Sequence, residues 1–114
     1  MAQSQERKVL LEEAAEHLVL AGLLRRGYVA SQAPRAWKAD DILCLDGFRI
    51  QVKATDKGGK QGWLIGNVEV DPRRFYAPVD FASENAPDVF FVASGVVREA
   101  AEEADCEYHR SPSR

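Results

Sequence analysis

The stretch that decides the fold covers residues 48–55 and reads FRIQVKAT. Apolar and polar residues alternate along it with a period of two, which is typical of a β-strand with one buried face. Ile50 and Val52 are therefore expected on one face, and Gln51 and Lys53 on the other. The pattern predicts a strand that presents an amide and an ammonium group side by side.

A partner strand is predicted over residues 39–45, joined to the first by an Asp46-Gly47 turn. In such a hairpin Asp41 starts the partner strand on the same side as Gln51 and Lys53. Carboxylate, amide and main-chain carbonyl oxygens are hard ligands that suit Mg²⁺, and an ammonium steadies a phosphate or orients an attacking water. A salt bridge across the hairpin is the alternative interpretation of this polar group.

Length and composition limit the kind of protein. A chain of 114 residues with 46% hydrophobic residues predicts one domain, residues 1–114, with one core. No apolar run approaches the roughly 20 residues that span a bilayer, so we expect a soluble, cytoplasmic protein without a membrane partner. Cys44 and Cys106 are too few and too far apart for a disulfide framework or a zinc site, and we expect both to be reduced.

The net charge of −3 weighs mildly against a general nucleic-acid binder, but the charge is unevenly spread. Residues 35–60 hold six basic and four acidic residues, and they surround the strand at residues 48–55, as a phosphate-binding site would require. Lys38, and Lys57 and Lys60 in the glycine-rich loop after that strand, are candidate nucleic-acid contacts. The alternative for the loop is a plain connection between strands.

A long helix is predicted over residues 5–26. Its apolar face is formed by residues that recur at intervals of three and four: Leu10, Leu11, Ala14, Ala15, Leu18, Ala21 and Leu24. The Arg25-Arg26-Gly27 sequence predicts its end, because basic residues favour the last turn and glycine accepts a left-handed cap. Glu16 has partly apolar surroundings on this helix. It is either a site residue or a solubilising surface residue.

The rest of the chain completes an α/β fold. A third strand is predicted at residues 75–81, where Pro78 indicates an edge or a bulge. Residues 88–94, DVFFVAS, form an apolar run typical of a strand covered on both faces, so we expect it to be central. A closing helix is expected at residues 95–108. The predicted architecture is a mixed central sheet of four to five strands, flanked by an N-terminal and a C-terminal helix.

The order of these motifs resembles the PD-(D/E)XK nuclease superfamily, which includes restriction endonucleases, archaeal Holliday-junction resolvases and intron-encoded homing endonucleases. Glu16 falls at the position of the helix glutamate, and Asp41 precedes two apolar residues as the first motif acid does. Gln51-Val52-Lys53 falls on the (D/E)XK motif. The resemblance covers most of the chain and implies a restriction endonuclease-like core.

Three departures accompany the resemblance. Gln51 is an amide where an acid is commoner, which removes one negative charge from the metal site. Asp40 stands where the family has a proline, so Asp40 and Asp41 are rival ligands at this stage. Pro78 and Ala93 occupy places where similar proteins have an ordinary strand residue and a proline.

The resemblance implies a Mg²⁺-dependent DNA endonuclease, with Mn²⁺ as a substitute for Mg²⁺. Asp41, the main-chain carbonyl of Val52, and Gln51 or Glu16 would hold the ion. Lys53 would orient or deprotonate the attacking water, and Glu16 would help to position the lysine or the water. We expect a homo-oligomer, a dimer or a tetramer, because so small a domain has little surface to embrace a duplex. The alternative is a catalytically inactive nuclease-like domain acting as a DNA-binding or protein-interaction module.

Overall fold

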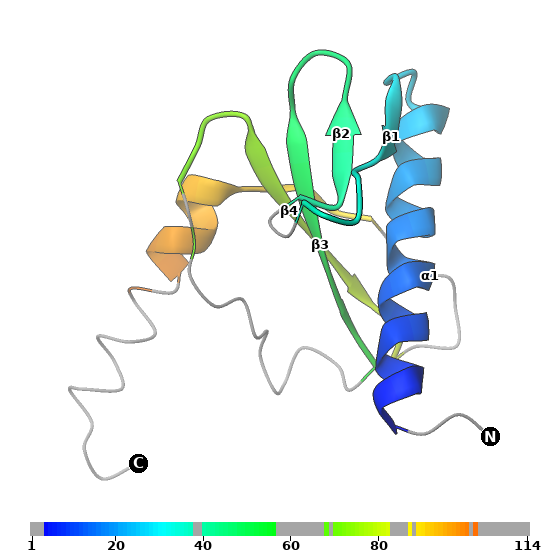
Figure 1. Cartoon of the computed structure of the whole chain (residues 1–114). Coiled ribbons are helices and arrows are strands. Elements are labelled where there is room, and N and C mark those ends of the chain that lie inside the picture. Colours follow the sequence, from blue (N-terminus) through cyan, green and yellow to red (C-terminus); the bar gives the residue numbers. More distant parts are fainter. Residues whose placement is uncertain are drawn as a thin grey trace, which may run out of the picture.

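One long helix and a five-stranded sheet form the body of the protein (Figure 1). The computed structural model describes residues 4–37, 40–56, 68, 70–82, 87, 89–100 and 102. Its elements are α1 (Ser4–Arg25), β1 (Ala30–Gln32), β2 (Ile42–Cys44), β3 (Arg49–Thr55), β4 (Arg74–Asp80) and β5 (Val92–Ala93), followed by a C-terminal helix at residues 94–100.

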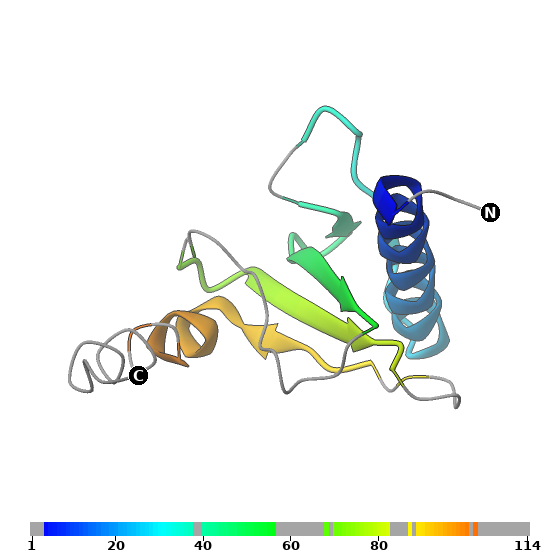
Figure 2. The same ribbon diagram turned by 90° about the horizontal axis from the view of Figure 1, so that it is seen from below.

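The sheet is mixed, with the strand order β1-β2-β3-β4-β5. Strands β3 and β4 are parallel, and the other neighbours are antiparallel. Helix α1 lies along one side of the sheet, and the C-terminal helix lies beyond the other side (Figure 2). The predicted fold class, a mixed α/β sheet flanked by an N-terminal and a C-terminal helix, is therefore confirmed.

The predicted hairpin is present as β2 and β3. Ile42 pairs with Ile50, and the main-chain N–H of Cys44 donates to the Phe48 carbonyl at 2.9 Å. Gly47 in the turn has a φ of 95°, a left-handed conformation that glycine adopts without the steric cost of a Cβ. The alternating pattern and the Asp46-Gly47 turn thus give the strand pairing and its register.

Helix α1 ends as the sequence predicts. Gly27 has a φ of 91°. The N–H of Tyr28 donates to the Leu23 carbonyl at 3.1 Å and that of Gly27 to the Leu24 carbonyl at 3.0 Å. These two bonds form a Schellman motif, which satisfies carbonyls that the end of a helix leaves unpaired.

The face that α1 buries differs from the predicted one. The residues that lie in the core against the sheet are Ala15, Val19 and Leu23. Four of the residues assigned to the apolar face are exposed: Leu10, Ala14, Ala21 and Leu24. The helix contacts the sheet along one narrow stripe with a four-residue spacing, so apolar residues beside that stripe stay in solvent.

The later strands also differ from expectation. β5 is the end strand of the sheet rather than a central one, and Phe90 just before it is 62% exposed. β4 lies between β3 and β5, although it contains Pro78. In the described part of the chain β5 pairs only with Phe75 and Tyr76, so the missing N–H of Pro78 interrupts no bond to β5. β4 therefore tolerates the proline, because the neighbouring strand β5 is short and does not pair with Pro78.

The structure describes one of the two cysteines and part of the chain in which a membrane-spanning helix could lie. Cys44 is buried in β2 with a free thiol, and burial, followed by the Asp46 charge, raises its pKa. Cys106 and half of the predicted helix at residues 95–108 lie outside the described residues. Among the helices that the structure describes, none is long and apolar enough to cross a bilayer.

Candidate metal and phosphate site

Asp41 lies where β2 separates from β3, one residue before the paired Ile42. Its main-chain N–H donates to the Ile50 carbonyl at 2.9 Å. Its carboxylate, rather than a main-chain carbonyl, accepts the next N–H along β3. The Asp41 Oδ2 accepts the main-chain N–H of Val52 at 2.7 Å. The carboxylate is therefore fixed at the end of β2 by both strands of the hairpin.

The main-chain carbonyl of Val52 belongs to the same corner. In a strand, the N–H and C=O of one residue point to the same edge, so the Val52 carbonyl faces the side from which Asp41 approaches. The Asp41 carboxylate thus binds the Val52 N–H at the edge of β3 to which the Val52 carbonyl, also a hard oxygen donor, points. This is the pair of ligands that the sequence assigned to a metal ion.

Burial makes the Asp41 carboxylate costly to ionise. Desolvation raises its pKa above the ordinary aspartate value, and the hydrogen bond from Val52 and the charge of Lys53 only partly oppose this. Glu12 and Asp40 add further upward contributions to the pKa of Asp41. A cation bound here would relieve the same cost.

Glu16 lies on α1 and approaches Asp41 from the helix. It follows the buried Ala15 and is itself partly buried. Burial raises the pKa of Glu16, and the Asp41 charge is the next cause in size. Helix packing therefore places Glu16 within electrostatic reach of Asp41, as the predicted site requires.

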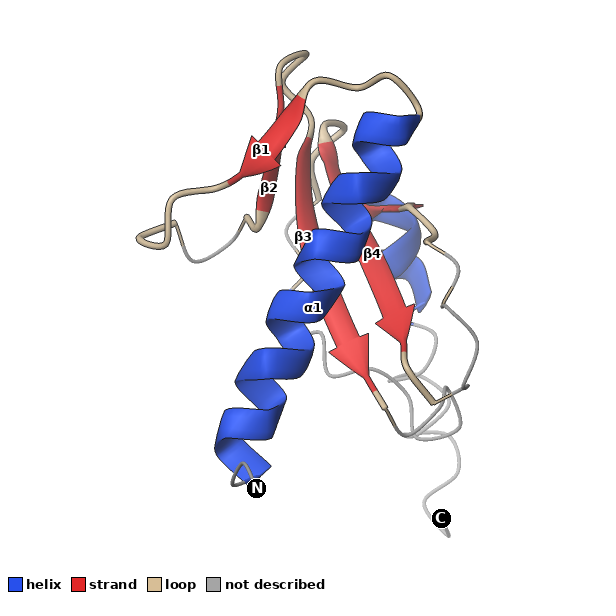
Figure 3. Cartoon of the chain, turned by 90° about the vertical axis from the view of Figure 1, so that its right-hand side faces the viewer, coloured by secondary structure: helices blue, strands red, loops and turns tan. Residues whose placement is uncertain are grey.

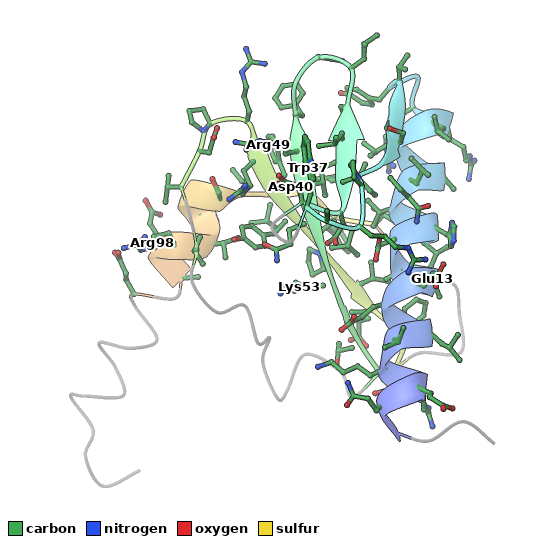
Figure 4. All side chains as sticks on the ribbon, viewed as in Figure 1. Glu13, Trp37, Asp40, Arg49, Lys53 and Arg98 are labelled. Atoms are coloured by element: carbon green, nitrogen blue, oxygen red, sulfur yellow. The ribbon has the colours of Figure 1, made fainter. Side chains whose placement is uncertain are left out.

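Gln51 and Lys53 approach from the other face of the sheet. Ile50 is packed in the core with α1 residues, so the alternation of β3 turns Gln51 and Lys53 away from α1. Gln51 pairs in register with Tyr76, which is buried in a second cluster with Val97 of the C-terminal helix. No described residue forms an ion pair with the Lys53 ammonium, which Figure 4 shows beside β3.

Two of the predicted site residues, Glu16 and Lys53, lie within electrostatic reach of Asp41. Glu16 reaches it from α1, and Lys53 reaches it along β3. The structure does not bring Glu16 and Gln51 to one face, and among the described residues no group of three or more acidic, histidine or cysteine side chains is arranged to hold a metal ion. The remaining donors suit Mg²⁺, which usually keeps several waters and takes one or two carboxylates together with substrate phosphates.

A groove of about 520 Å³ opens beside Asp41, and its lining residues come from α1 and from the connection between β1 and β2. Figure 3 shows where these two segments lie relative to the sheet. Its walls include five carboxylates and one arginine. The lining residues are Val9, Glu12, Glu13, Glu16, Gln32, Ala33, Pro34, Arg35, Trp37, Asp40 and Asp41. The groove is thus strongly acidic, and it holds Glu16 and Asp41 but not Gln51 or Lys53.

The choice between Asp40 and Asp41 follows from their partners. Asp40 is only 7% exposed, and its Oδ1 accepts a hydrogen bond from Arg74 Nη2 at 3.1 Å. Arg49 Nη1 lies 4.0 Å from the Asp40 Oδ2. Two arginines therefore neutralise Asp40, whereas Asp41 accepts a main-chain N–H within the part of the chain that the structure describes, and its pKa is raised. Asp41 is the better ligand, and Asp40 is a structural ion-pair partner.

The same arginines extend the network toward the C-terminal helix. Arg49 on β3 also bonds Asp71, whose main-chain N–H donates to the Ser94 hydroxyl at 2.9 Å. That hydroxyl donates in turn to the Asp71 carbonyl at 2.8 Å. The main-chain N–H of Arg73, then the Arg49 charge, hold the pKa of Asp71 below its usual range. This chain of contacts ties the start of β4 to β3 and to the helix.

The sequence interpretation missed three contributors. The Asp40–Arg74 pair joins residues 34 positions apart, and no local pattern indicates such a contact. Arg49, which alternates with Ile50 along the strand, was given no role. Trp37 lines the groove, and its neighbours Arg35 and Lys38 form a basic and aromatic segment that sequence inspection can recognise.

The proposed nucleic-acid contacts Lys38, Lys57 and Lys60 lie outside the described residues. No family model matches this chain, and neither the curated proteins nor the solved structures compared with it give a significant match. Its chemistry is therefore inferred from the site alone.

Proposed function

We propose that this protein is a metal-dependent DNA endonuclease of the PD-(D/E)XK type that hydrolyses phosphodiester bonds. The observation that supports the proposal is the corner at Asp41, where a partly buried carboxylate binds the Val52 N–H and lies within electrostatic reach of Lys53 and Glu16. Hard oxygen donors next to a lysine are what phosphate-ester hydrolysis at a Mg²⁺ or Mn²⁺ ion needs. A bound ion would act as a Lewis acid on the scissile phosphate.

Each residue has a distinct task in this proposal. Asp41 and the Val52 carbonyl hold the ion, with Glu16 supporting from α1. Lys53 contacts the phosphate and orients the attacking water, and its charge stabilises the negative charge that develops in the transition state. Gln51 lies on the Lys53 face of β3 and, as a neutral amide, is assigned the weaker role of an oxygen donor there.

A second candidate is a catalytically inactive nuclease-like domain that binds DNA or a protein. Two observations favour it. Gln51 supplies no charge at the place of the motif acid, and the groove beside Asp41 is acidic. An acidic groove repels DNA phosphates unless a divalent cation intervenes, so this candidate predicts binding without turnover.

The deciding experiment is cleavage of supercoiled, branched and single-stranded DNA in Mg²⁺ or Mn²⁺ by the wild-type protein and Lys53→Ala. We expect the substitution to lower the cleavage rate by about 10²- to 10⁴-fold, the usual effect of a residue that orients or deprotonates a nucleophile. Lys8→Ala, at an exposed position of α1, is the matched control for loss of one positive charge. Equal cleavage by wild type and Lys53→Ala would indicate a contaminant and would reject the enzyme.

We further propose that the protein works as a homo-oligomer. Apolar side chains are exposed at the end of the molecule near β1, where Leu24, Tyr28, Val29 and Leu45 are between 44% and 79% exposed. An oligomer would cover such side chains and would give a small domain enough surface to hold DNA. Sedimentation equilibrium of the wild type, beside Leu45→Glu, measures this directly. A monomer at all concentrations would contradict it.

A further inference from the structure

We infer that the acidic groove takes a single unpaired nucleotide, whose base stacks on Trp37 while its phosphate lies at Asp41. The inference rests on the proposed nuclease function and gives it a substrate class: single-stranded, flapped or branched DNA rather than intact duplex. It adds Trp37 as the residue that selects this substrate.

Trp37 is placed as a stacking platform. It is 51% exposed although it is the largest type of apolar side chain, and it lines the same groove as Asp41 and Glu16. Its main-chain N–H donates to the Pro34 carbonyl at 2.9 Å, so a turn holds its backbone. Figure 4 shows Trp37 and Asp40 on the same connection in front of the sheet. An exposed aromatic ring on a fixed turn is the usual way in which proteins stack a nucleobase.

The size of the groove argues for one strand. Its volume of about 520 Å³ lies within the range of sites that enclose a small molecule, roughly 300 to 1,000 Å³. A nucleotide fits such a space, whereas a double helix does not. A base can enter so narrow a space only from an unpaired nucleotide, and the cost of unpairing is smallest where the strand is already single.

The negative charge of the groove predicts how nucleotide binding depends on divalent cations. Glu12, Glu13, Glu16 and Asp41 outnumber Arg35, because Asp40 is already paired with arginines. A phosphate would be repelled from this surface in the absence of a divalent cation, and it would be attracted once a cation binds between it and the carboxylates. Binding of the nucleotide therefore depends on a divalent cation. A basic peptide in the same groove would show the opposite dependence.

The test uses the fluorescence of Trp37. The chain has two tryptophans, so Trp63→Phe leaves Trp37 as the only one. We titrate this protein with a short oligothymidylate, with a blunt duplex and with an oligolysine peptide, each in Ca²⁺ and in EDTA. Ca²⁺ is chosen as a hard cation that takes oxygen ligands but fits a Mg²⁺ geometry poorly, so that binding is read without turnover. We expect quenching by the single strand in Ca²⁺ alone.

A second measurement does not depend on the folding of the Trp63 variant. Anisotropy of labelled DNA in Ca²⁺ compares wild type, Trp37→Ala and Trp37→Phe. We expect Trp37→Ala to weaken single-strand binding by about 5- to 150-fold, the range found for loss of one stacked base. Trp37→Phe should keep most of the affinity because a phenyl ring also stacks, and duplex affinity should change less than twofold.

The outcomes separate this inference from the proposed function. Equal effects of Trp37→Ala on single-stranded and duplex DNA, or quenching that is stronger in EDTA, would overturn the inference. Preference for oligolysine in EDTA would assign the groove to a basic peptide instead. If Trp37 proves irrelevant while Lys53-dependent cleavage is observed, the nuclease stands without this substrate selection. If cation-dependent quenching occurs without any cleavage, nucleotide binding stands and hydrolysis is rejected.

Discussion

At the residue scale, the buried Asp41 carboxylate has a cost for stability that depends on pH. Burial raises its pKa, so the folded protein holds the Asp41 proton more tightly than the unfolded chain does. Stability that depends on the protonated carboxyl is fully present below the unfolded pKa, roughly 4, and is lost as pH rises through the raised folded pKa. At neutral pH the ionised Asp41 therefore destabilises the metal-free protein.

Asp41→Asn should consequently stabilise the metal-free protein while it abolishes metal-dependent activity. The asparagine oxygen can still accept the Val52 N–H, but no buried charge remains. We expect a gain of about 0.5–2 kcal/mol at pH 7, the range of typical stabilising substitutions. Urea denaturation between pH 3.5 and 8 measures it, and the gain should disappear below about pH 4. A loss of stability at pH 7 would contradict this account of Asp41.

The neighbouring Asp40 should behave in the opposite way. Asp40→Asn removes the negative charge that faces the buried Arg74 guanidinium, which is 5% exposed. Breaking a buried ion pair from one side typically costs about 3–5 kcal/mol, a large part of the stability of a small domain. Thermal and urea unfolding would show the loss. Asp46→Asn, at an exposed turn position, is the control and should stay within about 0.5 kcal/mol. Equal effects of the two substitutions would mean that the Asp40–Arg74 pair contributes little.

At the scale of elements, two glycines of α1 give a matched pair of tests. Gly27 closes the helix with a φ of 91°, so Gly27→Ala forces an alanine into a left-handed conformation. Such a conformation costs an L-residue about 1–2 kcal/mol. Gly22 lies inside the helix, and a Cβ there would meet only the mobile end of Arg26 at 3.1 Å, with Val89 at 3.9 Å. Gly22→Ala should therefore stabilise the protein by about 0.5–1 kcal/mol.

Chemical denaturation of both variants checks the pair, since the wild-type protein should fall between them. If Gly27→Ala were as stable as wild type, the helix would end by another arrangement. If Gly22→Ala were destabilised, the contact with Arg26 would be rigid rather than adaptable.

The hairpin could be predicted from the sequence because its signals are local. Alternation over residues 48–55 and the Asp46-Gly47 turn fix the register, and the register places Asp41 beside Val52. The prediction of which α1 residues are buried was wrong, since Leu10 and Leu24 are as apolar as the residues that the sheet covers. The predicted central position of β5 was wrong as well, because an apolar run does not reveal whether a strand has a neighbour on each side.

The sequence proposed members for the candidate site but not their geometry. Sequence spacing identified Glu16, Asp41 and Lys53, which the structure brings into electrostatic contact through Asp41. The spacing did not indicate that Glu16 approaches Asp41 from α1 and that Lys53 approaches it from the opposite face of β3. Nor could it separate Asp40 from Asp41, because that difference depends on Arg74, which is 34 positions away.

At the scale of the whole molecule, the groove concentrates negative charge between α1 and the sheet. The carboxylates on both walls repel one another, and the raised pKa values of Glu16 and Asp41 record part of that repulsion. A divalent cation that binds only the folded protein stabilises it by mass action, by about 1.4 kcal/mol at ten times the dissociation constant. For a domain of this size that corresponds to an increase in the unfolding temperature of roughly 5 °C.

We therefore expect Mg²⁺ or Mn²⁺ to raise the unfolding temperature of the wild-type protein in a saturable way. Asp41→Asn should lose most of this increase, and Lys53→Ala should keep it, because in the proposed function the lysine contacts the phosphate and not the ion. NaCl at the same ionic strength is the control for simple screening of charges. An equal increase with NaCl would mean that the carboxylates are merely a solvated acidic surface. An increase that persists in Asp41→Asn would move the ion away from the corner where Asp41 meets Val52, and with it the place at which a phosphate could be cut.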